Sequence, residues 1–296
     1  MLTTDIRIGQ LKHLLSTKRC LRVLEAHSPI SALLAQHARS EQGSGCKIGF
    51  DAVWSSSLTD STNRGLPDIE ILNPLSRLQN VEDIFAVSSL PMIFDGDTGG
   101  KPEHLAFYVR ALERVGVSAI VIEDKCGLKK NSLFGNDVYQ QQESTEDFCD
   151  KIRSGREALL TKDFMIFARC ESLILDRGID DALQRSLSYV EAGAHGVMIH
   201  SRRKDGREII EFAQHFRKHH GTVPLICVPT SYAHLRFDDL EKSGFNIVIY
   251  ANHLLRSAYL AMRGVANEIL RNGRTLEIED RCLGIDEILH LIPGTR

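Results

Sequence analysis

Eight short apolar segments, rich in β-branched and aromatic residues, recur along this 296-residue chain with longer segments between them. They are Cys20–Leu24, Ile48–Val53, Pro91–Phe94, Ala119–Ile122, Phe164–Ala168, Gly196–Ile199, Leu225–Val228 and Ile247–Tyr250. Runs such as AIVI and IVIY are hydrophobic at every position, which is typical of parallel strands buried on both faces. The intervening segments carry apolar residues at helical spacing, and two of them end at Gly116 and Gly193, where a left-handed residue closes a helix.

Strands that alternate with helices require right-handed crossovers between parallel strands. Eight repeats predict an α/β fold closed into a (β/α)₈ TIM-type barrel, as a single domain over residues 1–296. An open, doubly wound sheet is the alternative. Two regions exceed a minimal barrel. A polar segment at about 126–147 is expected to form a loop over the site, and a helical extension is expected at about 252–296.

Composition excludes several classes of protein. The formal net charge is −3 and the sequence pI is about 6.5, so no nucleic acid or anionic membrane is expected as a partner. The chain holds no apolar run near the roughly 18 residues that a membrane span needs. Its seven cysteines are scattered and contain no CxxC pair, which argues against a disulfide framework or a zinc site. We therefore expect a cytoplasmic protein.

Polar side chains follow nearly all of the eight predicted strands. They are Glu25, His27, Trp54, Ser55, Ser56, Ser57, Asp95, Asp97, Glu123, Asp124, Lys125, Arg169, Glu171, His200, Ser201, Thr230 and Asn252. In a (β/α)₈ barrel the carboxyl ends of the strands meet on one face, and the active site lies there. The sequence therefore predicts an active site at that face.

Three carboxylates carry the metal prediction. Asp95, Asp97 and Glu123 follow neighbouring strands, and carboxylates placed so closely repel one another unless a cation compensates them. Hard oxygen ligands select Mg²⁺ or Mn²⁺, and Mg²⁺ keeps several waters, so some carboxylates act through water. The alternative is that Asp95 and Asp97 only cap the next helix or form a turn in FDGDTGG.

Other polar residues suit an anionic substrate. Arg169 is fitted to grip a carboxylate or phosphoryl group, although an ion pair with a neighbouring glutamate would also account for it. His200 is either a ligand of the substrate or a histidine satisfied within the core. The serines of Ser55–Leu58 are donors for an oxyanion or merely turn residues. The run Lys129–Asn131 opens the polar loop, whose closure would bring positive charge onto the substrate and exclude water.

The motifs WSSSLTDSTNRGLPD, FDGDTGG, IEDKCGLKKNS, ARCES and MIHS, in this order, resemble those of the phosphoenolpyruvate mutase family in the isocitrate lyase superfamily. The resemblance runs from about Leu21 to Ser201 and more loosely beyond. Lyases of this superfamily carry a KKCGH-like segment whose cysteine is the catalytic base. Here the corresponding stretch is LKKNS, which disfavours a carbon–carbon lyase.

The resemblance implies roles for particular residues. The direct Mg²⁺ ligand would be Asp95, and metal-bound waters would be held by Asp68, Asp97 and Glu123. Substrate contacts would come from Trp54, Ser56, Ser57, Leu58, Arg169 and His200. The polar loop would be a gating loop that contributes Lys129, Asn131 and Ser132, with Asn131 reaching the transferred phosphoryl group. The chain departs from the family where some branches have glycine in place of Ser57, and at Gly100-Lys101.

The reaction implied by the resemblance is the interconversion of phosphoenolpyruvate and phosphonopyruvate, which forms a carbon–phosphorus bond. Whether Asp68 acts as nucleophile or as electrostatic partner stays open. Phosphonopyruvate hydrolase and carboxyphosphoenolpyruvate phosphonomutase are rival activities, and a catalytically silent barrel that serves as a scaffold is the alternative outside enzymes. The resemblance also implies a homotetramer whose C-terminal helices are swapped between subunits. Because carbon–phosphorus bond formation is uphill, a downstream enzyme that consumes phosphonopyruvate is expected.

Overall fold

The computed structural model describes residues 3–42 and 45–294, except for the side chains of Gln42 and Cys46. The described chain forms two compact units. The first ends at Asn252 and the second begins at His253.

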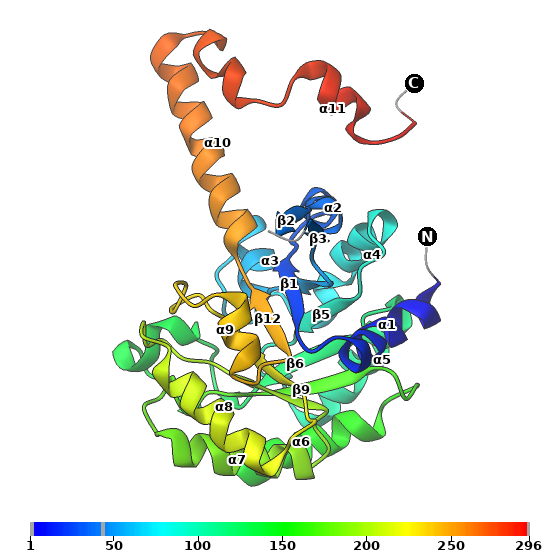
Figure 1. Cartoon of the computed structure of the whole chain (residues 1–296), viewed down its shortest axis with the longest axis vertical. Coiled ribbons are helices and arrows are strands. Elements are labelled where there is room, and N and C mark those ends of the chain that lie inside the picture. The colour runs from blue at the N-terminus through cyan, green and yellow to red at the C-terminus, as the bar shows by residue number, and fades with distance from the viewer. Residues whose placement is uncertain (1–2, 43–44, 295–296) are drawn as a thin grey trace. The chain divides into compact units, whose positions relative to one another are not determined.

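The first unit is a closed barrel of eight parallel strands, with helices around it (Figure 1). The strands are β1 (Leu21–Glu25), β4 (Ala52–Ser55), β5 (Met92–Asp95), β6 (Ala119–Glu123), β9 (Met165–Cys170), β10 (Gly196–Ile199), β11 (Leu225–Cys227) and β12 (Ile247–Tyr250). Each strand pairs with its neighbours along the chain, and β1 pairs with both β4 and β12, which closes the barrel. The prediction of a (β/α)₈ barrel is confirmed, and the open sheet is excluded.

Helices connect these strands. They are α1 (Thr4–Thr17), α2 (Pro29–His37), α3 (Ser57–Asn63), η1 (Pro74–Arg77), α4 (Leu78–Val87), α5 (Pro102–Val115), α6 (Thr145–Glu157), α7 (Ile179–Glu191), α8 (Arg207–His219) and α9 (Phe237–Lys242). Gly116 closes α5 with a φ of 95°, and Gly193 follows α7 with a φ of 106°. Both glycines therefore adopt the left-handed conformation that the sequence predicted.

The barrel interior is packed with alternate residues of the strands. The buried cluster takes Leu21 and Val23 from β1, and it takes Ala119 and Val121 from β6. The same parity holds on the other strands, because successive side chains of a strand point to opposite faces. Leu11 of α1 is fully buried in this cluster. By the same alternation of side chains, Asp95, Glu123 and Arg169 point inward at the carboxyl ends of their strands.

One predicted strand was misplaced. The segment Ile48–Val53 is not one strand: Cys46–Ile48 forms β3, which pairs antiparallel with β2 (Ser40–Gln42), and the barrel strand β4 begins only at Ala52. The apolar run is interrupted by Gly49 and Asp51, and the Asp51 carboxylate accepts a hydrogen bond from the backbone N–H of Arg22 at 2.8 Å. This bond anchors the turn before β4 to β1.

The predicted loop at about 126–147 contains regular structure. β7 (Lys125–Cys126) pairs antiparallel with β8 (Gln141–Gln142), and the 3₁₀ helix η2 (Ser132–Asp137) lies between them. The loop ends at Ser144 rather than Asp147, because the Ser144 hydroxyl accepts from the backbone N–H of Asp147 and so begins α6 at Thr145.

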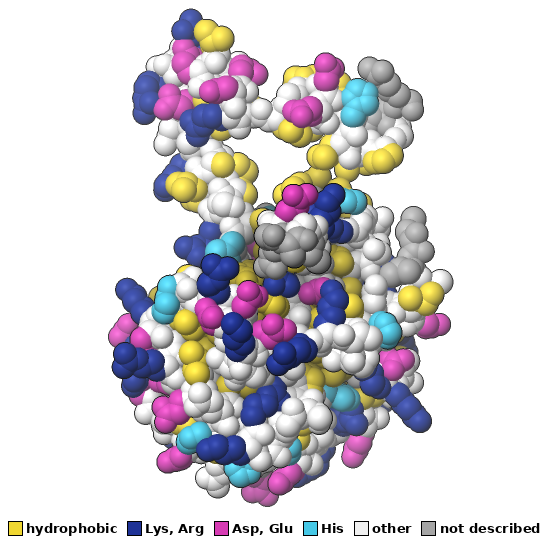
Figure 2. All heavy atoms as spheres, in the orientation of Figure 1, with side chains coloured by type: hydrophobic (Ala, Val, Ile, Leu, Met, Phe, Trp, Pro, Cys, Tyr) yellow, Lys and Arg dark blue, Asp and Glu magenta, His cyan; other side chains and the backbone are white. Residues whose placement is uncertain are grey.

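The second unit contains α10 (His253–Asn272), η3 (Leu276–Arg281) and α11 (Ile285–Leu291), as the predicted helical extension requires. Within it, Ile278 of η3 is buried, whereas many large apolar side chains are exposed. They are Tyr259, Leu260, Met262, Ile269, Leu270, Leu276, Leu283, Ile285, Ile288, Leu289, Leu291 and Ile292. Among the helices described, none is long and apolar enough to cross a bilayer. On the visible face of the barrel unit, basic and acidic side chains are interspersed (Figure 2).

Candidate active site

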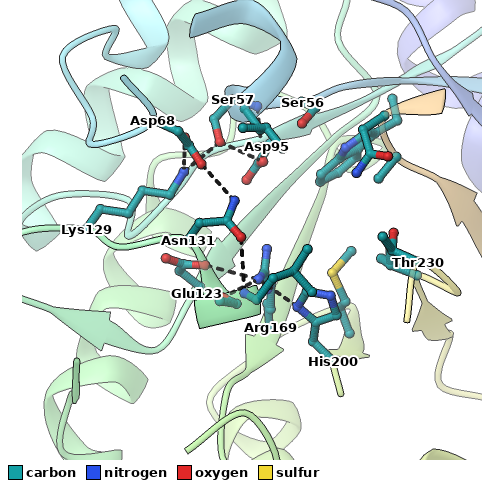
Figure 3. A pocket seen from close by; sticks show the side chains of 18 residues that line it. Ser56, Ser57, Asp68, Asp95, Glu123, Lys129, Asn131, Arg169, His200 and Thr230 are labelled. Atoms are coloured by element: carbon teal, nitrogen blue, oxygen red, sulfur yellow. Dashed lines mark hydrogen bonds and ion pairs between the residues drawn. The ribbon is translucent and has the colours of Figure 1, made fainter. Parts of the chain in front are cut away.

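The inward residues at the carboxyl ends of the strands surround one cavity (Figure 3). Its lining residues are Trp54, Ser56, Ser57, Leu58, Asp68, Asp95, Glu123, Lys129, Asn131, Ser132, Leu133, Arg169, Met198, His200, Val228, Thr230, Ala251 and Asn252. Every predicted site residue except Asp97 is in this set. Asp97 contacts Lys129, and Lys129 lines the cavity. The strand ends and the loop at 125–144 therefore build a single site.

The carboxylate of Asp95 is fixed at the end of β5. Its Oδ2 accepts hydrogen bonds from the backbone N–H of Ser57 at 3.1 Å and from the Ser57 hydroxyl at 2.9 Å. Asp97 lies two residues further on, with a left-handed φ of 55°. Glu123, on the neighbouring strand β6, is 2% exposed, and its Oε1 forms an ion pair with Lys125 Nζ at 3.2 Å. Its buried carboxylate adds negative charge beside Asp95, where a cation or a metal-bound water would lie.

The ammonium group of Lys129 lies among these carboxylates. Its Nζ is 2.7 Å from Asp68 Oδ1 and 2.7 Å from the Ser57 hydroxyl, and it also forms an ion pair with Asp97. Burial opposes the charge on Lys129, but the surrounding carboxylates outweigh burial and raise its pKa. Lys129 therefore stays protonated, and it compensates part of the negative charge of the site.

The two aspartates differ in their protonation equilibria. Burial tends to raise the pKa of Asp95, but Lys129, Arg169 and Arg77 together outweigh burial and lower it. For Asp97, burial dominates, and together with the neighbouring Asp95 it outweighs Lys129 and raises the pKa to about 7. The site thus holds one firmly ionised carboxylate beside another whose charge depends on its surroundings.

On the opposite side of the cavity, Arg169 organises a polar cluster. Its Nε donates to Glu171 Oε1 at 2.6 Å, and its Nη2 donates to the Ser132 hydroxyl at 2.7 Å and to His200 Nδ1 at 2.8 Å. An arginine only donates, so His200 must accept at Nδ1 and carry its proton on Nε2. Burial, and then the positive charge of Arg169, lower the pKa of His200 and keep the ring neutral. The ion pair considered as an alternative for Arg169 is present, and Arg169 nevertheless lines the cavity.

The loop at 125–144 is attached to the site at its base. Lys125 Nζ donates to the carbonyl of Lys130 at 2.7 Å and to the Ser132 hydroxyl at 2.9 Å, and it lies 3.2 Å from Glu123 Oε1. Asn131 Nδ2 donates to Asp68 Oδ2 at 3.1 Å across the cavity. The loop residues Lys129 and Asn131 are thereby brought to the strand ends (Figure 3), and Ser132 is brought there by its hydrogen bonds with Lys125 and Arg169.

Arg77 contacts the backbone and a carboxylate behind the cavity, and no motif or spacing in the sequence indicated this role. It is fully buried, its Nε donates to Asp60 Oδ2 at 2.6 Å, and its Nη2 donates to the carbonyl of Ser55 at 2.9 Å. Its Nη1 donates to the carbonyl of Asp95, and its guanidinium lies 3.9 Å from the centre of the Phe94 ring. Arg77 therefore joins the ends of β4 and β5.

Some polar residues at the strand ends do not reach the cavity. Glu25 and His27 contact each other at 2.5 Å, and Ser55 donates to Asp60 rather than into the site. Asp124 faces outward, where it accepts from the Tyr189 hydroxyl at 2.6 Å. Burial dominates the environment of Asp124 and raises its pKa to about 6.

Conversely, four lining residues were not named from sequence. They are Leu133, Met198, Val228 and Ala251, whereas Thr230 and Asn252 were placed at the strand ends without an assigned role. The inward parity of β10 and β11, which gives Met198 and Val228, was the signal that would have identified two of them.

The donor set fits a magnesium ion that binds largely through water. Within residues 3–42 and 45–294, no three Asp, Glu, His or Cys side chains converge closely enough to enclose an ion by themselves. Mg²⁺ usually takes only one or two carboxylates and keeps several waters. Asp95, with its lowered pKa, meets that requirement, and Glu123 lines the same cavity.

The acidic cluster, the arginine and the histidine lie at the carboxyl ends of the strands of a closed (β/α)₈ barrel. Enzymes with this fold have their active sites at that face. Residues 11–270 match the family model described as phosphoenolpyruvate phosphomutase, and the chain belongs to this family within the isocitrate lyase superfamily. Members of the superfamily include mutases, a hydrolase and lyases.

The relatives of this chain include both phosphonopyruvate hydrolases and phosphoenolpyruvate phosphomutases. The phosphonopyruvate hydrolase of Variovorax sp. (strain Pal2) is 36% identical over 95% of this chain and 93% of its own. The phosphoenolpyruvate phosphomutase structure from Streptomyces platensis subsp. rosaceus superposes with a TM-score of 0.87, at 33% identity over 96% of this chain and 94% of the other. A phosphonopyruvate hydrolase solved with oxalate and Mg²⁺ gives a TM-score of 0.84, at 34% identity over 98% and 95% of the two chains.

Proposed function

We propose that this chain is a Mg²⁺-dependent phosphoenolpyruvate mutase, which moves a phosphoryl group between the C2 oxygen and C3 of a pyruvate skeleton. The observation that carries the proposal is the position of the gating loop, residues 126–144. Its Lys129, Asn131 and Ser132 reach across to Ser57, Asp68 and Arg169. A loop held in this way covers the reacting group and excludes the water that would otherwise intercept it.

The chain's own residues would bind the metal ion and orient the substrate. Asp95, with Asp68, Asp97 and Glu123 acting through water, would hold the Mg²⁺, which would supply positive charge to the substrate oxygens when it is bound. Trp54 Nε1 is buried without a hydrogen-bond partner among the described residues, and it lines the cavity as a free donor. Ser56, Ser57 and Leu58 border the same end, where the substrate carboxylate would lie.

The phosphoryl group would lie between the gating loop and the cluster around Arg169. The C3–P bond of phosphonopyruvate breaks and an O–P bond forms at the C2 oxygen, so the reaction needs neither water nor a second substrate. A loose transition state spreads negative charge over the three phosphoryl oxygens. Arg169, Asn131, Lys129 and the Nε2–H of His200 are donors arranged around that charge, which is how a preformed site lowers the barrier. Asp68, held by Lys129 and Asn131, is an electrostatic partner or a nucleophile.

A hydrolase is the second candidate, because the Variovorax hydrolase is 36% identical to this chain. It would use the same residues and would admit water to the phosphoryl group. A ³¹P NMR time course with phosphonopyruvate and Mg²⁺ separates the two. Growth of the phosphoenolpyruvate signal supports the mutase, whereas inorganic phosphate with pyruvate indicates the hydrolase. An unchanged spectrum would contradict both and would favour a related phosphonomutase or a silent barrel.

We also propose a homotetramer in which C-terminal helices are swapped between subunits. A groove outside β1 and β12 is lined by the apolar or aromatic residues Ile48, Phe50, Phe237 and Tyr250 and by the charged residues Arg22, Arg236 and Asp238. The second unit exposes large apolar side chains on all three of its helices, and α11 has no buried residue. Such apolar surfaces are typical of subunit interfaces. Light scattering of the full chain tests the proposal, and a monomer at micromolar concentration would contradict it. For a mutase, whose equilibrium opposes carbon–phosphorus bond formation, an enzyme that consumes phosphonopyruvate is the expected metabolic partner.

A further inference from the structure

The gating loop is also fastened at a point away from the cavity. Its 3₁₀ helix η2 places Ser132 and Leu133 in the cavity lining, and it places Asn136 near the loops that follow β9 and β10. There, Asn136 Nδ2 donates to Asp176 Oδ2 at 2.8 Å, and Arg202 Nη2 donates to the same oxygen at 2.6 Å. One carboxylate thus joins three loops, which follow β6, β9 and β10.

The backbone of the gating loop fits closely over Arg202. Gly135 has φ 53° and ψ −133°, a conformation that side chains with a Cβ rarely adopt. A Cβ at this position would lie 2.5 Å from Arg202 Cζ. The Nε of Arg202 is buried under the loop and has no hydrogen-bond partner in the part of the chain that the structure describes. The glycine is therefore required for the loop to lie flat on the guanidinium.

Asp176 is held in an unusual conformation at the same point. Its φ is 55°, in the left-handed region that costs a residue other than glycine free energy. The surrounding contacts must compensate that cost. The carboxylate of Asp176 makes those contacts with Asn136 and Arg202.

We propose that Asn136, Asp176 and Arg202 form a latch that holds the gating loop closed during phosphoryl transfer. They are positioning residues, since none of them lines the cavity. The inference rests on the proposed mutase function. When the latch is open, water reaches the phosphoryl group. The C3–P bond then breaks, a P–O bond forms to water, C3 takes up a proton, and pyruvate and inorganic phosphate are released. The latch therefore sets the ratio of phosphoenolpyruvate to inorganic phosphate.

The test compares Asp176→Ala and Asn136→Ala with the wild-type full chain. Arg203→Ala is the matched control, because Arg203 makes an exposed ion pair with Glu208 next to the latch. Hydrogen–deuterium exchange of residues 126–144 without substrate measures loop opening. Product ratios from phosphonopyruvate, by ³¹P NMR, measure the entry of water. Both latch variants should raise the exchange rate and the phosphate fraction about two- to five-fold, the effect expected for losing an exposed ion pair or hydrogen bond.

The control should behave as the wild type. Asp176→Asn should raise the exchange rate and the phosphate fraction less than Asp176→Ala does, because its amide oxygen can still accept from Asn136. Unchanged exchange in both latch variants would overturn the latch. Faster exchange with an unchanged product ratio would overturn its role in water exclusion. A wild-type chain that produces no phosphoenolpyruvate would refute the mutase proposal instead, and the exchange measurement would still decide whether the latch exists.

Discussion

Glu123 and Arg169 stand in register on the neighbouring strands β6 and β9, and Arg169 Nη2 lies 3.5 Å from Glu123 Oε2. Glu123 is buried and Arg169 is largely buried at the point where the acidic and basic halves of the cavity meet. Burial, which dominates, raises the pKa of Glu123, while Lys125 and Arg169 oppose the shift. The charge of Glu123, in the proposed metal site, is therefore coupled to Arg169, which lies in the proposed phosphoryl site.

Arg169→Lys should reduce kcat/KM about 100-fold or more, because a buried donor aimed at a transition-state charge contributes on that scale. Lysine keeps the charge but cannot donate to Glu171, Ser132 and His200 from one planar group. Phosphonopyruvate turnover with Mg²⁺ is the measurement. Arg203→Lys, on the exposed pair with Glu208, is the control and should retain wild-type rates. Equal rates for the two variants would show that Arg169 has no role in catalysis.

Asn131→Ala should lower kcat by about 100-fold or more, since it deletes a donor placed against the phosphoryl group. The melting temperature should change little, because among the residues that the structure describes the Asn131 side chain makes two hydrogen bonds, to Asp68 and to the backbone N–H of Leu133. Kinetics and circular dichroism of the same preparation measure the two effects. A folded variant with a normal kcat would show that the gating loop contributes no catalytic group.

The barrel was predictable because its strands are continuous apolar runs, and the polar residue after each run marks the strand end. The structure brings four of these residues, Asp95, Glu123, Arg169 and His200, to the lining of one cavity. The strand error at Ile48–Val53 has a local cause, since a hairpin and a barrel strand share one apolar stretch that only tertiary pairing divides.

Other features depend on contacts that the sequence does not encode locally. Arg77 lies in a short helical segment, and its role comes from three long-range partners at the ends of β4 and β5. Likewise, Asp176 and Arg202 meet the gating loop only after the barrel has closed. Inward parity, by contrast, is a period-2 signal, and it would have added Met198 and Val228 to the predicted site.

Asp95→Ala should abolish activity and the response to metal together. For the wild type, Mg²⁺ with oxalate, a mimic of the pyruvate enolate, should raise the melting temperature, because a ligand that binds only the folded state stabilises it. At 100 times the Kd the gain is about 2.7 kcal/mol. The variant should show no such rise in thermal denaturation with and without the pair. Full activity, or an unchanged rise, would overturn the assignment of Asp95 to the metal.

Arg77→Met should lower the free energy of unfolding by about 3–5 kcal/mol, because it leaves the buried carboxylate of Asp60 without its cation. Asp60 is 1% exposed and lies 2.6 Å from Arg77 Nε. Urea denaturation measures the loss. The double variant Arg77→Met with Asp60→Asn should recover part of it, since no unpaired charge remains. A loss of less than about 1 kcal/mol, typical of surface pairs, would show that this pair is not isolated from solvent.

His195 should contribute to acid sensitivity well away from the active site. Its Nδ1 accepts a hydrogen bond from the backbone N–H of Ile166 at 2.9 Å, and its other ring nitrogen contacts Arg156. Burial, then Arg156 and Lys12, lower its pKa to about 4 from 6.5. As pH falls through this window, the unfolded chain takes up a proton that the folded chain does not, so stability is lost between about pH 6.5 and 4.

His195→Asn should flatten that loss, because the amide oxygen can accept from Ile166 without titrating. Melting temperatures between pH 7 and pH 4.5 are the measurement, and the variant's decrease should be smaller by about 2–4 °C, the shift expected for 1 kcal/mol in a protein of this size. His13→Asn, on the exposed face of α1, should leave the slope unchanged. Identical slopes for the wild type and His195→Asn would mean that His195 is protonated in the folded chain, and its hydrogen bond to Ile166 would then be absent.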